Sequence, residues 1–274
     1  MGEWTSGDVD VNGVRLHYHR TGGGGRPLIL LHGFSDSGLC WTRVARDLET
    51  DYDVVMPDAR GHGRSDRGGA AFDAAQRARD AAELIRSLGL EQVALAGHSM
   101  GAQTAAEIAA TEHELTACVI LEDPPWRDAT QTTAGRWDYI RRAQELPREE
   151  VPAYCRQLHP TWDDAEVEPW VDAKRQFDLS LLEAPRPGSS RPWREIVAAI
   201  RCPTLLLTAD PDLGAIVTPE AGTEAARLAR GRVERIAGAG HNIRREQYPA
   251  YRAAFTGFLH QVYPPAGVRA EEAT

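Results

Sequence analysis

The sequence lacks the features of several protein classes. Its 274 residues include only four cysteines, Cys40, Cys118, Cys155 and Cys202, which are widely spaced and form no C-x-x-C pair. No apolar run approaches the roughly 20 residues that a membrane-spanning helix needs, and the first residues contain no apolar signal segment. We therefore expect a cytoplasmic protein with reduced thiols and no membrane partner.

Negative charge outweighs positive charge, and lysine is almost absent. Asp and Glu number 40 against 31 Lys and Arg, which gives a formal net charge of −9. This balance repels polyphosphate, so we expect no nucleic-acid partner. Lys174 is the only lysine. The simplest explanation for arginine at every other basic position is the coding preference of a GC-rich genome.

What the sequence does contain is an alternation of short aliphatic runs with longer amphipathic stretches. Hydrophobic residues make up 42% and charged residues 26% of the chain, which is typical of a folded globular protein. The alternation predicts an α/β fold around a mostly parallel sheet. The expected strands are Val14–Tyr18, Leu28–Leu31, Val54–Met56, Val93–Ala96, Cys118–Leu121, Thr204–Thr208 and Val233–Ile236. Apolar residues at three- and four-residue spacing predict helices over Ala74–Leu88, Met100–Ala110, Pro219–Ala229 and Gln247–Val262.

One segment interrupts this alternation. Residues 124–197 contain no convincing strand, many prolines and five of the seven tryptophans. We interpret this segment as a helical insertion into a core domain formed by residues 1–123 and 198–274. Its tryptophans either fill a small core of the insertion itself or face a substrate pocket, and Trp126, Trp137 and Trp162 are the candidates for the pocket.

A G-x-S-x-G motif at residues 97–101 marks a candidate nucleophile, Ser99. The motif follows a predicted strand and precedes a predicted helix, which is the setting that a serine nucleophile at a sharp turn requires. The two glycines leave room where side chains would collide across the turn.

Such a serine needs a base, usually a histidine that a carboxylate orients. His241 is the candidate among nine histidines, because it follows a predicted strand through a loop of small residues. For the carboxylate, the predicted strand Thr204–Thr208 is followed by Asp210 and Asp212. We favour Asp212, because Asp210 could instead cap its own turn. Glu122 or Asp123, after the strand that precedes the insertion, is a third possibility.

The site also needs donors for the oxyanion of a tetrahedral intermediate. The segment His32-Gly33-Phe34 follows the predicted strand Leu28–Leu31 directly. We expect the backbone N–H groups of Phe34 and Met100 to converge on one oxygen. His32 then braces the loop.

With Ser99, Asp212 and His241 in that chain order, and with H-G-F ahead of them, the sequence resembles the α/β-hydrolase family over nearly its whole length. The segments Asp58–Ser65 and Gly238–Asn242 are similar to two loops of that family. The resemblance implies an eight-stranded, mostly parallel sheet flanked by helices, with a helical cap between the sixth and seventh strands. It implies no metal or organic cofactor.

The nucleophile type narrows the function within that family. Haloalkane dehalogenases and epoxide hydrolases use a carboxylate where this chain has Ser99. We expect hydrolysis of a small carboxylic ester or lactone, with an apolar or aromatic body, through an acyl-enzyme on Ser99. The alternatives are a carbon–carbon bond hydrolase, a cofactor-free perhydrolase or acyltransferase, and a ligand receptor without activity.

Overall fold

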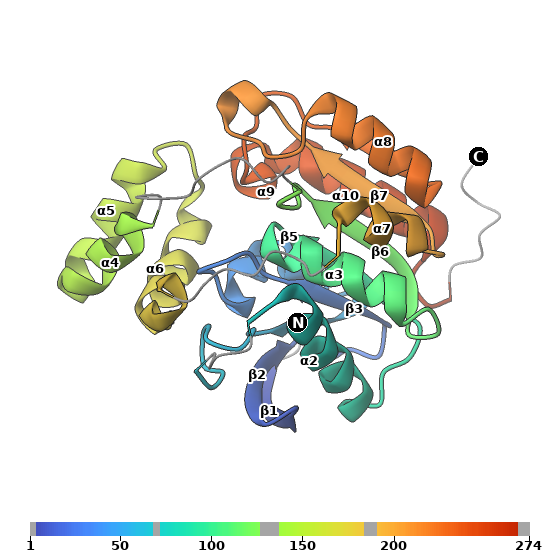
Figure 1. Cartoon of the computed structure of the whole chain (residues 1–274). Coiled ribbons are helices and arrows are strands. Elements are labelled where there is room, and N and C mark those ends of the chain that lie inside the picture. Colours follow the sequence, from blue (N-terminus) through green and yellow to red (C-terminus); the bar gives the residue numbers. More distant parts are fainter. Residues whose placement is uncertain (1–3, 68–71, 127–136, 184–190, 268–274) are drawn as a thin grey trace.

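Eight strands form one sheet in the computed structural model, which describes residues 4–67, 72–126, 137–183 and 191–267. Their order across the sheet is β1-β2-β4-β3-β5-β6-β7-β8. Strands β1 and β2 are antiparallel to their neighbours, and β3 to β8 are parallel (Figure 1). The strands are β1 (Thr5–Val11), β2 (Val14–Arg20), β3 (Arg26–Leu31), β4 (Tyr52–Pro57), β5 (Val93–His98), β6 (Thr116–Glu122), β7 (Thr204–Thr208) and β8 (Arg232–Arg235).

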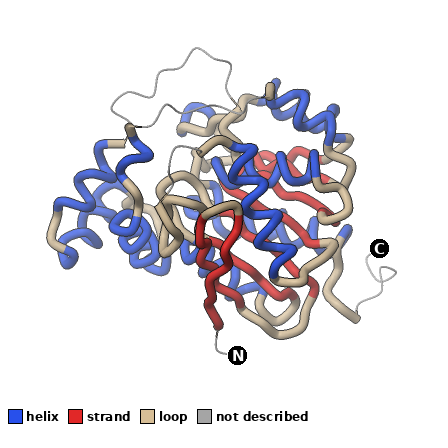
Figure 2. Tube along the Cα trace, turned by 60° about the horizontal axis from the view of Figure 1, so that its bottom comes forward, coloured by secondary structure: helices blue, strands red, loops and turns tan. Residues whose placement is uncertain are grey.

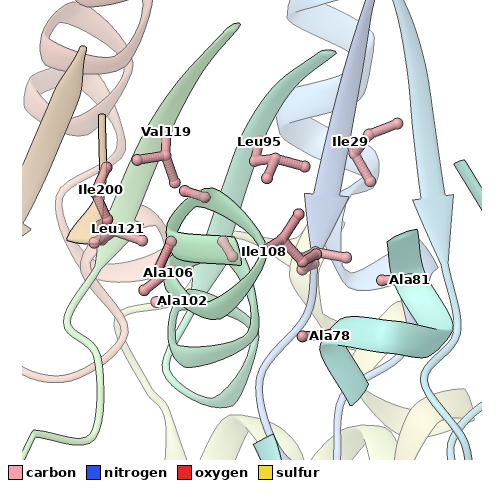
Figure 3. Close-up of a cluster of buried hydrophobic side chains, with 14 of the residues drawn as sticks. Ile29, Ala78, Ala81, Leu95, Ala102, Ala106, Ile108, Val119, Leu121 and Ile200 are labelled. Atoms are coloured by element: carbon pink, nitrogen blue, oxygen red, sulfur yellow. The ribbon is translucent and has the colours of Figure 1, made fainter. Parts of the chain in front are cut away.

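Helices cover both faces of this sheet (Figure 2). Alternate residues of the central strands point to opposite faces, so the buried side chains fall into two apolar clusters. One cluster includes Ile29 and Leu95, which lie near α2 (Ala74–Ser87) and α3 (Met100–Thr111) in Figure 3. The same cluster also includes residues of α7 (Trp193–Ala199) and α8 (Pro219–Ala229). The other includes Leu30 and Ala96 and packs against α1 (Thr42–Leu48) and α10 (Tyr248–Val262). A short helix, α9 (Ile243–Glu246), precedes α10.

Between β6 and β7 the chain leaves the sheet. Helices α4 (Asp138–Glu145), α5 (Val151–Leu158) and α6 (Val167–Gln176) lie together at one side of the molecule in both views (Figures 1 and 2). They share a small apolar core that includes Val151, Trp170 and Val171. A second cluster, which includes Phe177 and Leu181, joins this part to Phe34 of the sheet domain.

The fold class expected from the sequence is confirmed, with seven of the strands and four of the helices within a few residues of their predicted bounds. Strand β1 and the helices α1 and α9 were not predicted. Strand β8 ends at Arg235, so Ile236 lies beyond it, in the loop that leads to His241. No helix in the described part of the chain is long and apolar enough to cross a membrane.

Candidate active site

Ser99 occupies the turn between β5 and α3. Its backbone has φ 52° and ψ −114°, a conformation that residues other than glycine rarely adopt and that costs about 1–3 kcal/mol. The flanking glycines make this turn possible. A Cβ on Gly97 would lie 2.3 Å from the carbonyl of Gly101, and one on Gly101 would lie 2.0 Å from the carbonyl oxygen of Leu31. The turn therefore presents the Ser99 hydroxyl at the carboxyl edge of the sheet.

His241 reaches this hydroxyl from the loop between β8 and α9. Its Nε2 lies 3.0 Å from Ser99 Oγ, within hydrogen-bond distance. The imidazole is about one-fifth exposed, which keeps it open to a substrate. The structure thus brings together the two residues that the sequence pairs as nucleophile and base.

The carboxylate beside His241 belongs to Asp123, so the prediction of Asp212 is wrong. Asp123 Oδ2 lies 2.6 Å from His241 Nδ1, and the Asp123 side chain is fully buried. The same carboxylate accepts backbone N–H bonds from Ile216, at 2.8 and 3.0 Å, and from Val217, at 2.9 Å. These bonds fix its orientation, and with Nδ1 donating to Asp123 the free Nε2 can accept the proton of Ser99.

Neither of the acids after β7 contacts the imidazole. Asp210 accepts a hydrogen bond from the backbone N–H of Gly238 at 2.8 Å and forms an ion pair with Arg235 at 2.7 Å. Both interactions lower the pKa of Asp210, and the bond from Gly238 has the larger effect. It supports the loop that carries His241. Asp212 is exposed in a 3₁₀ turn at Pro211–Leu213. Glu122, the other candidate, accepts the backbone N–H of Arg244 at 3.0 Å.

The loop after β3 packs closely against the serine turn. His32 Nε2 accepts the backbone N–H of Ala59 at 2.9 Å, so its protonated Nδ1 donates to the carbonyl of Gly33 at 2.8 Å. Burial lowers the pKa of His32, which keeps it neutral. A Cβ on Gly33 would lie 2.7 Å from Nδ1 of His98, beside Ser99. The bracing role expected for His32 is confirmed, and Phe34 follows at the edge of the site.

His98, which precedes Ser99, holds the loop that carries His241. Its Nε2–H donates to the backbone carbonyl of His241 at 2.9 Å, and the centres of the two rings lie 4.8 Å apart. Burial is the main cause that holds the pKa of His98 well below its usual value, and Arg244 and His241 lower it further. His98 is therefore neutral and acts as a fixed donor. Sequence reasoning did not single it out.

The three candidate pocket tryptophans lie in different surroundings. The ring of Trp137 packs edge-on against Phe34, with 4.8 Å between ring centres. Trp126 stacks on Trp193 at 5.0 Å within the apolar cluster on one face of the sheet. Trp162 stacks on His159 at 3.7 Å beside the core of the insertion. The contacts of Trp126 and Trp162 favour packing roles, and Trp137 remains the pocket candidate.

Around this site, charged side chains are buried in unusual number. Asp36, Glu122, Glu166, Lys174, Arg244 and Arg245 all have side chains 5% exposed or less, and they form one ionic network. None of them was predicted as part of the site, apart from Glu122 as an alternative acid. Within the described ranges, no group of three or more His, Cys, Asp or Glu residues could hold a metal ion.

Comparison with known proteins gives a consistent picture. A model of the alpha/beta hydrolase family matches residues 28–254. N-formylmaleamate deformylase of Pseudomonas putida is 30% identical over 264 residues, which cover 92% of this chain and 96% of that protein.

Solved structures agree with the sequence matches. The crystal structure of an N-formylmaleamic acid deformylase from Pseudomonas putida S16 is 26% identical, with a TM-score of 0.74, and covers 92% of this chain and 100% of that one. An enol-lactonase from Burkholderia xenovorans LB400 shares the fold, at 20% identity and a TM-score of 0.68, over 92% of this chain and 99% of its own.

Proposed function

Because the chain belongs to the alpha/beta hydrolase family, we propose that it is a serine hydrolase that cleaves a small carboxylic ester or lactone through an acyl-enzyme. One observation carries the proposal. Ser99 Oγ, His241 and the buried carboxylate of Asp123 form a continuous chain of hydrogen-bond contacts, 3.0 Å and 2.6 Å long. This is the arrangement that turns a weakly nucleophilic hydroxyl into an acylating group.

In the acylation step, His241 Nε2 takes the proton of Ser99 as Oγ forms a bond to the substrate carbonyl carbon. The carbonyl oxygen becomes an oxyanion, which the backbone N–H groups of Phe34 and Met100 stabilise. Each such donor contributes about 2.7–4 kcal/mol to the transition state in enzymes where it has been measured. When the intermediate collapses, the ester bond breaks and His241 gives its proton to the leaving oxygen.

In the deacylation step, water takes the place of the leaving alcohol. His241 removes a proton from the water, whose oxygen attacks the acyl carbon, and the oxyanion forms again at the same donors. Breakdown of this intermediate returns the proton to Ser99 and releases the acid. Asp123 keeps its charge throughout and stabilises the imidazolium that forms in each step.

The body of the substrate lies against aromatic side chains in this proposal. The Phe34 ring contacts Trp137, Phe177 and Phe72, with 4.8, 5.0 and 6.1 Å between ring centres. These rings come from the oxyanion loop, the insertion and the segment before α2. They form one apolar cluster around the residue that carries the proposed oxyanion donor, which favours a substrate with an apolar or aromatic body.

A second candidate is the hydrolysis of an N-formyl amide. It is favoured by the 30% identity to N-formylmaleamate deformylase over nearly the full length of both chains. The same residues serve this reaction: Ser99 takes the formyl group, and His241 protonates the departing nitrogen. The two candidates differ only in the leaving group and in the size of the acyl group.

The test measures both reactions with one set of variants. Wild-type protein is incubated with p-nitrophenyl acetate and butyrate, and separately with N-formylmaleamate, with formate as the product measured. Ser99→Ala is expected to abolish turnover, and Ser180→Ala, at an exposed serine, is the matched control. Faster ester than formamide turnover, judged by kcat/KM, supports the first candidate, and the reverse order supports the second. Wild-type turnover no greater than that of Ser99→Ala on all substrates refutes both.

A further inference from the structure

The only lysine of the chain is buried at the centre of the ionic network, where α6 of the insertion meets the loop after β3. Lys174 Nζ donates to the backbone carbonyl of Ser35 at 2.8 Å and to Asp36 Oδ1 at 2.9 Å. Ser35 comes directly after Phe34, whose N–H is the proposed oxyanion donor. A residue of the insertion therefore holds the Ser35–Asp36 peptide, which follows two peptide groups after the one that carries that donor.

The backbone of Ser35 has an unfavourable conformation, which contacts from its neighbours must stabilise. It is fully buried and has φ 66°, a left-handed conformation that costs a residue with a side chain about 1–3 kcal/mol. A second residue of the insertion contacts it, since Tyr139 Oη on α4 lies 3.2 Å from Ser35 Oγ. Side chains from two helices of the insertion, α4 and α6, thus both bind Ser35.

Asp36 ties this contact to the loop of the base. Its Oδ2 lies 3.1 Å from Arg245 and 3.4 Å from Arg244, both a few residues after His241. Burial alone would raise the pKa of Asp36, but Arg245, Lys174 and Arg244 outweigh it and hold the pKa well below its usual value. Asp36 is therefore a permanent anion to which the insertion, the oxyanion loop and the His241 loop are all attached.

Stability does not explain why such a network is present. Moving charges out of water costs several kcal/mol for each ion, and apolar side chains of similar size often stabilise a fold as well or better. Coding preference does not explain Lys174 either, because arginine occupies every other basic position. The compact ammonium group of Lys174 donates to a carbonyl and to a carboxylate at the same time, whereas a guanidinium is a larger planar fork.

We propose that Lys174, supported by Tyr139, is a positioning residue for the oxyanion loop, so that the insertion sets the geometry of the Phe34 N–H without touching the reacting atoms. The proposal rests on the serine-hydrolase function above. Loss of Lys174 leaves the carbonyl of Ser35 without its donor, and the strained peptide relaxes. The oxyanion donor then moves away from its place, which weakens the transition state more than the bound substrate.

The test compares Lys174→Met and Tyr139→Phe with wild type on p-nitrophenyl butyrate. Lys174→Met is expected to lower kcat about 10–100-fold with KM changed less than threefold, because removal of a whole oxyanion donor costs about 100–1000-fold. Tyr139→Phe, which removes one hydroxyl, is expected to lower kcat about two- to fivefold. Binding of butylboronic acid, a tetrahedral analogue, should weaken by the same factors, while inhibition by butyrate stays unchanged.

Arg60→Met is the matched control, because it also removes a buried cation from a carboxylate, here Asp80, 2.6 Å away. It is expected to lower the melting temperature and leave kcat and boronate binding within twofold of wild type. The inference is overturned if folded Lys174→Met keeps wild-type kcat, or if Arg60→Met loses kcat and boronate affinity to the same extent. If Lys174→Met does not fold, unchanged kcat and boronate binding in Tyr139→Phe overturn it. An inactive wild type refutes the proposed function instead.

Discussion

The identity of the catalytic acid yields the sharpest prediction, because three aspartates lie near the same sheet edge and only one of them contacts the base. Asp123→Asn changes a single atom of the group beside His241. The side-chain oxygen of an asparagine there faces two demands, since it can accept the N–H groups of Ile216 and Val217 or the N–H of the imidazole. The two buried backbone N–H groups make three contacts of 2.8–3.0 Å with the carboxylate of Asp123. Because leaving them without an acceptor is costly, they keep the asparagine oxygen turned toward Ile216 and Val217.

The amide NH2 of the variant then faces His241 Nδ1. A donor at that place favours the tautomer that carries its proton on Nε2, and this tautomer cannot accept the proton of Ser99. In a serine protease, the same exchange at the corresponding acid lowers kcat about 10⁴-fold while the geometry stays intact. We expect a loss of about 10³–10⁴-fold in kcat for Asp123→Asn, with KM changed little.

The other two aspartates provide the controls. Asp212→Asn, at an exposed side chain, is expected to stay within twofold of wild type. Asp210→Asn weakens the contacts to Gly238 and Arg235 and is expected to lose less than tenfold. The assay is the initial rate on p-nitrophenyl butyrate, with circular dichroism to show that each variant folds. Folded Asp123→Asn with a tenth or more of wild-type kcat, or a 10³-fold loss in Asp212→Asn, would show that the acid is misassigned.

Two predictions concern stability. Burial holds the pKa of His62 and of His98 well below 6.5, so both are neutral when folded and bind protons on unfolding. Their stabilising contribution is complete above pH 6.5 and falls as the pH drops, by about 1.4 kcal/mol each at pH 5.5. The difference in unfolding free energy between pH 7.5 and pH 5.5, measured with urea, should be about 1.4 kcal/mol smaller in His62→Asn than in wild type, in which other buried histidines such as His32 also contribute. An unchanged difference would contradict the assignment. Gly101→Ala is expected to lower the free energy of unfolding by more than about 3 kcal/mol, because the added Cβ would lie 2.0 Å from the Leu31 carbonyl oxygen. Gly257→Ala, in open space on α10, should raise it by up to about 1 kcal/mol. Equal changes in the two variants would contradict this prediction.

The parts of the fold that sequence predicts are those set by local patterns. The central strands are continuous aliphatic runs, because both of their faces are covered by helices. Strand β1 escaped prediction because it is an edge strand of Thr5–Val11, with a glycine and two aspartates, and most of its residues are exposed or half-buried. Ser99 was found because a nucleophile at a strand-to-helix turn requires glycines at fixed spacing.

The acid was misassigned for a geometric reason. Strands β6 and β7 are parallel neighbours, so their carboxyl ends meet at the same edge, and acids after either strand could reach His241. What decides between them is the direction in which each loop leaves the sheet. Asp210 turns toward Arg235 and Gly238, whereas Asp123, at φ 39°, turns toward the imidazole. No spacing in the sequence encodes that difference.

Lys174 shows a second limit of sequence reasoning. The sequence shows that lysine is rare, but composition does not show that Lys174 is buried. Its partner in the structure, the carbonyl of Ser35, precedes it by more than 130 residues in the sequence. Contacts between segments so distant depend on how the insertion docks. The contacts of the tryptophans also depend on how the insertion docks. Trp137 packs against Phe34, whereas Trp126 stacks on Trp193 and Trp162 stacks on His159.

Strain at the site follows one pattern that links these observations. Ser35, Ser99 and Asp123 all have positive φ, of 66°, 52° and 39°, and all lie on loops at the carboxyl edge of the parallel strands. Ser99 and Asp123 are fixed by strands of the core, since their N–H groups donate to the carbonyls of Glu122 at 2.9 Å and Leu207 at 3.0 Å. Ser35 is gripped instead by side chains of the insertion. The proposed nucleophile and acid are therefore held by the sheet. The loop of the proposed oxyanion donor is braced by His32 at Gly33 but depends on the docked insertion at Ser35, so substitutions of Lys174 or Tyr139 should change kcat even where they leave Ser99, His241 and Asp123 in place.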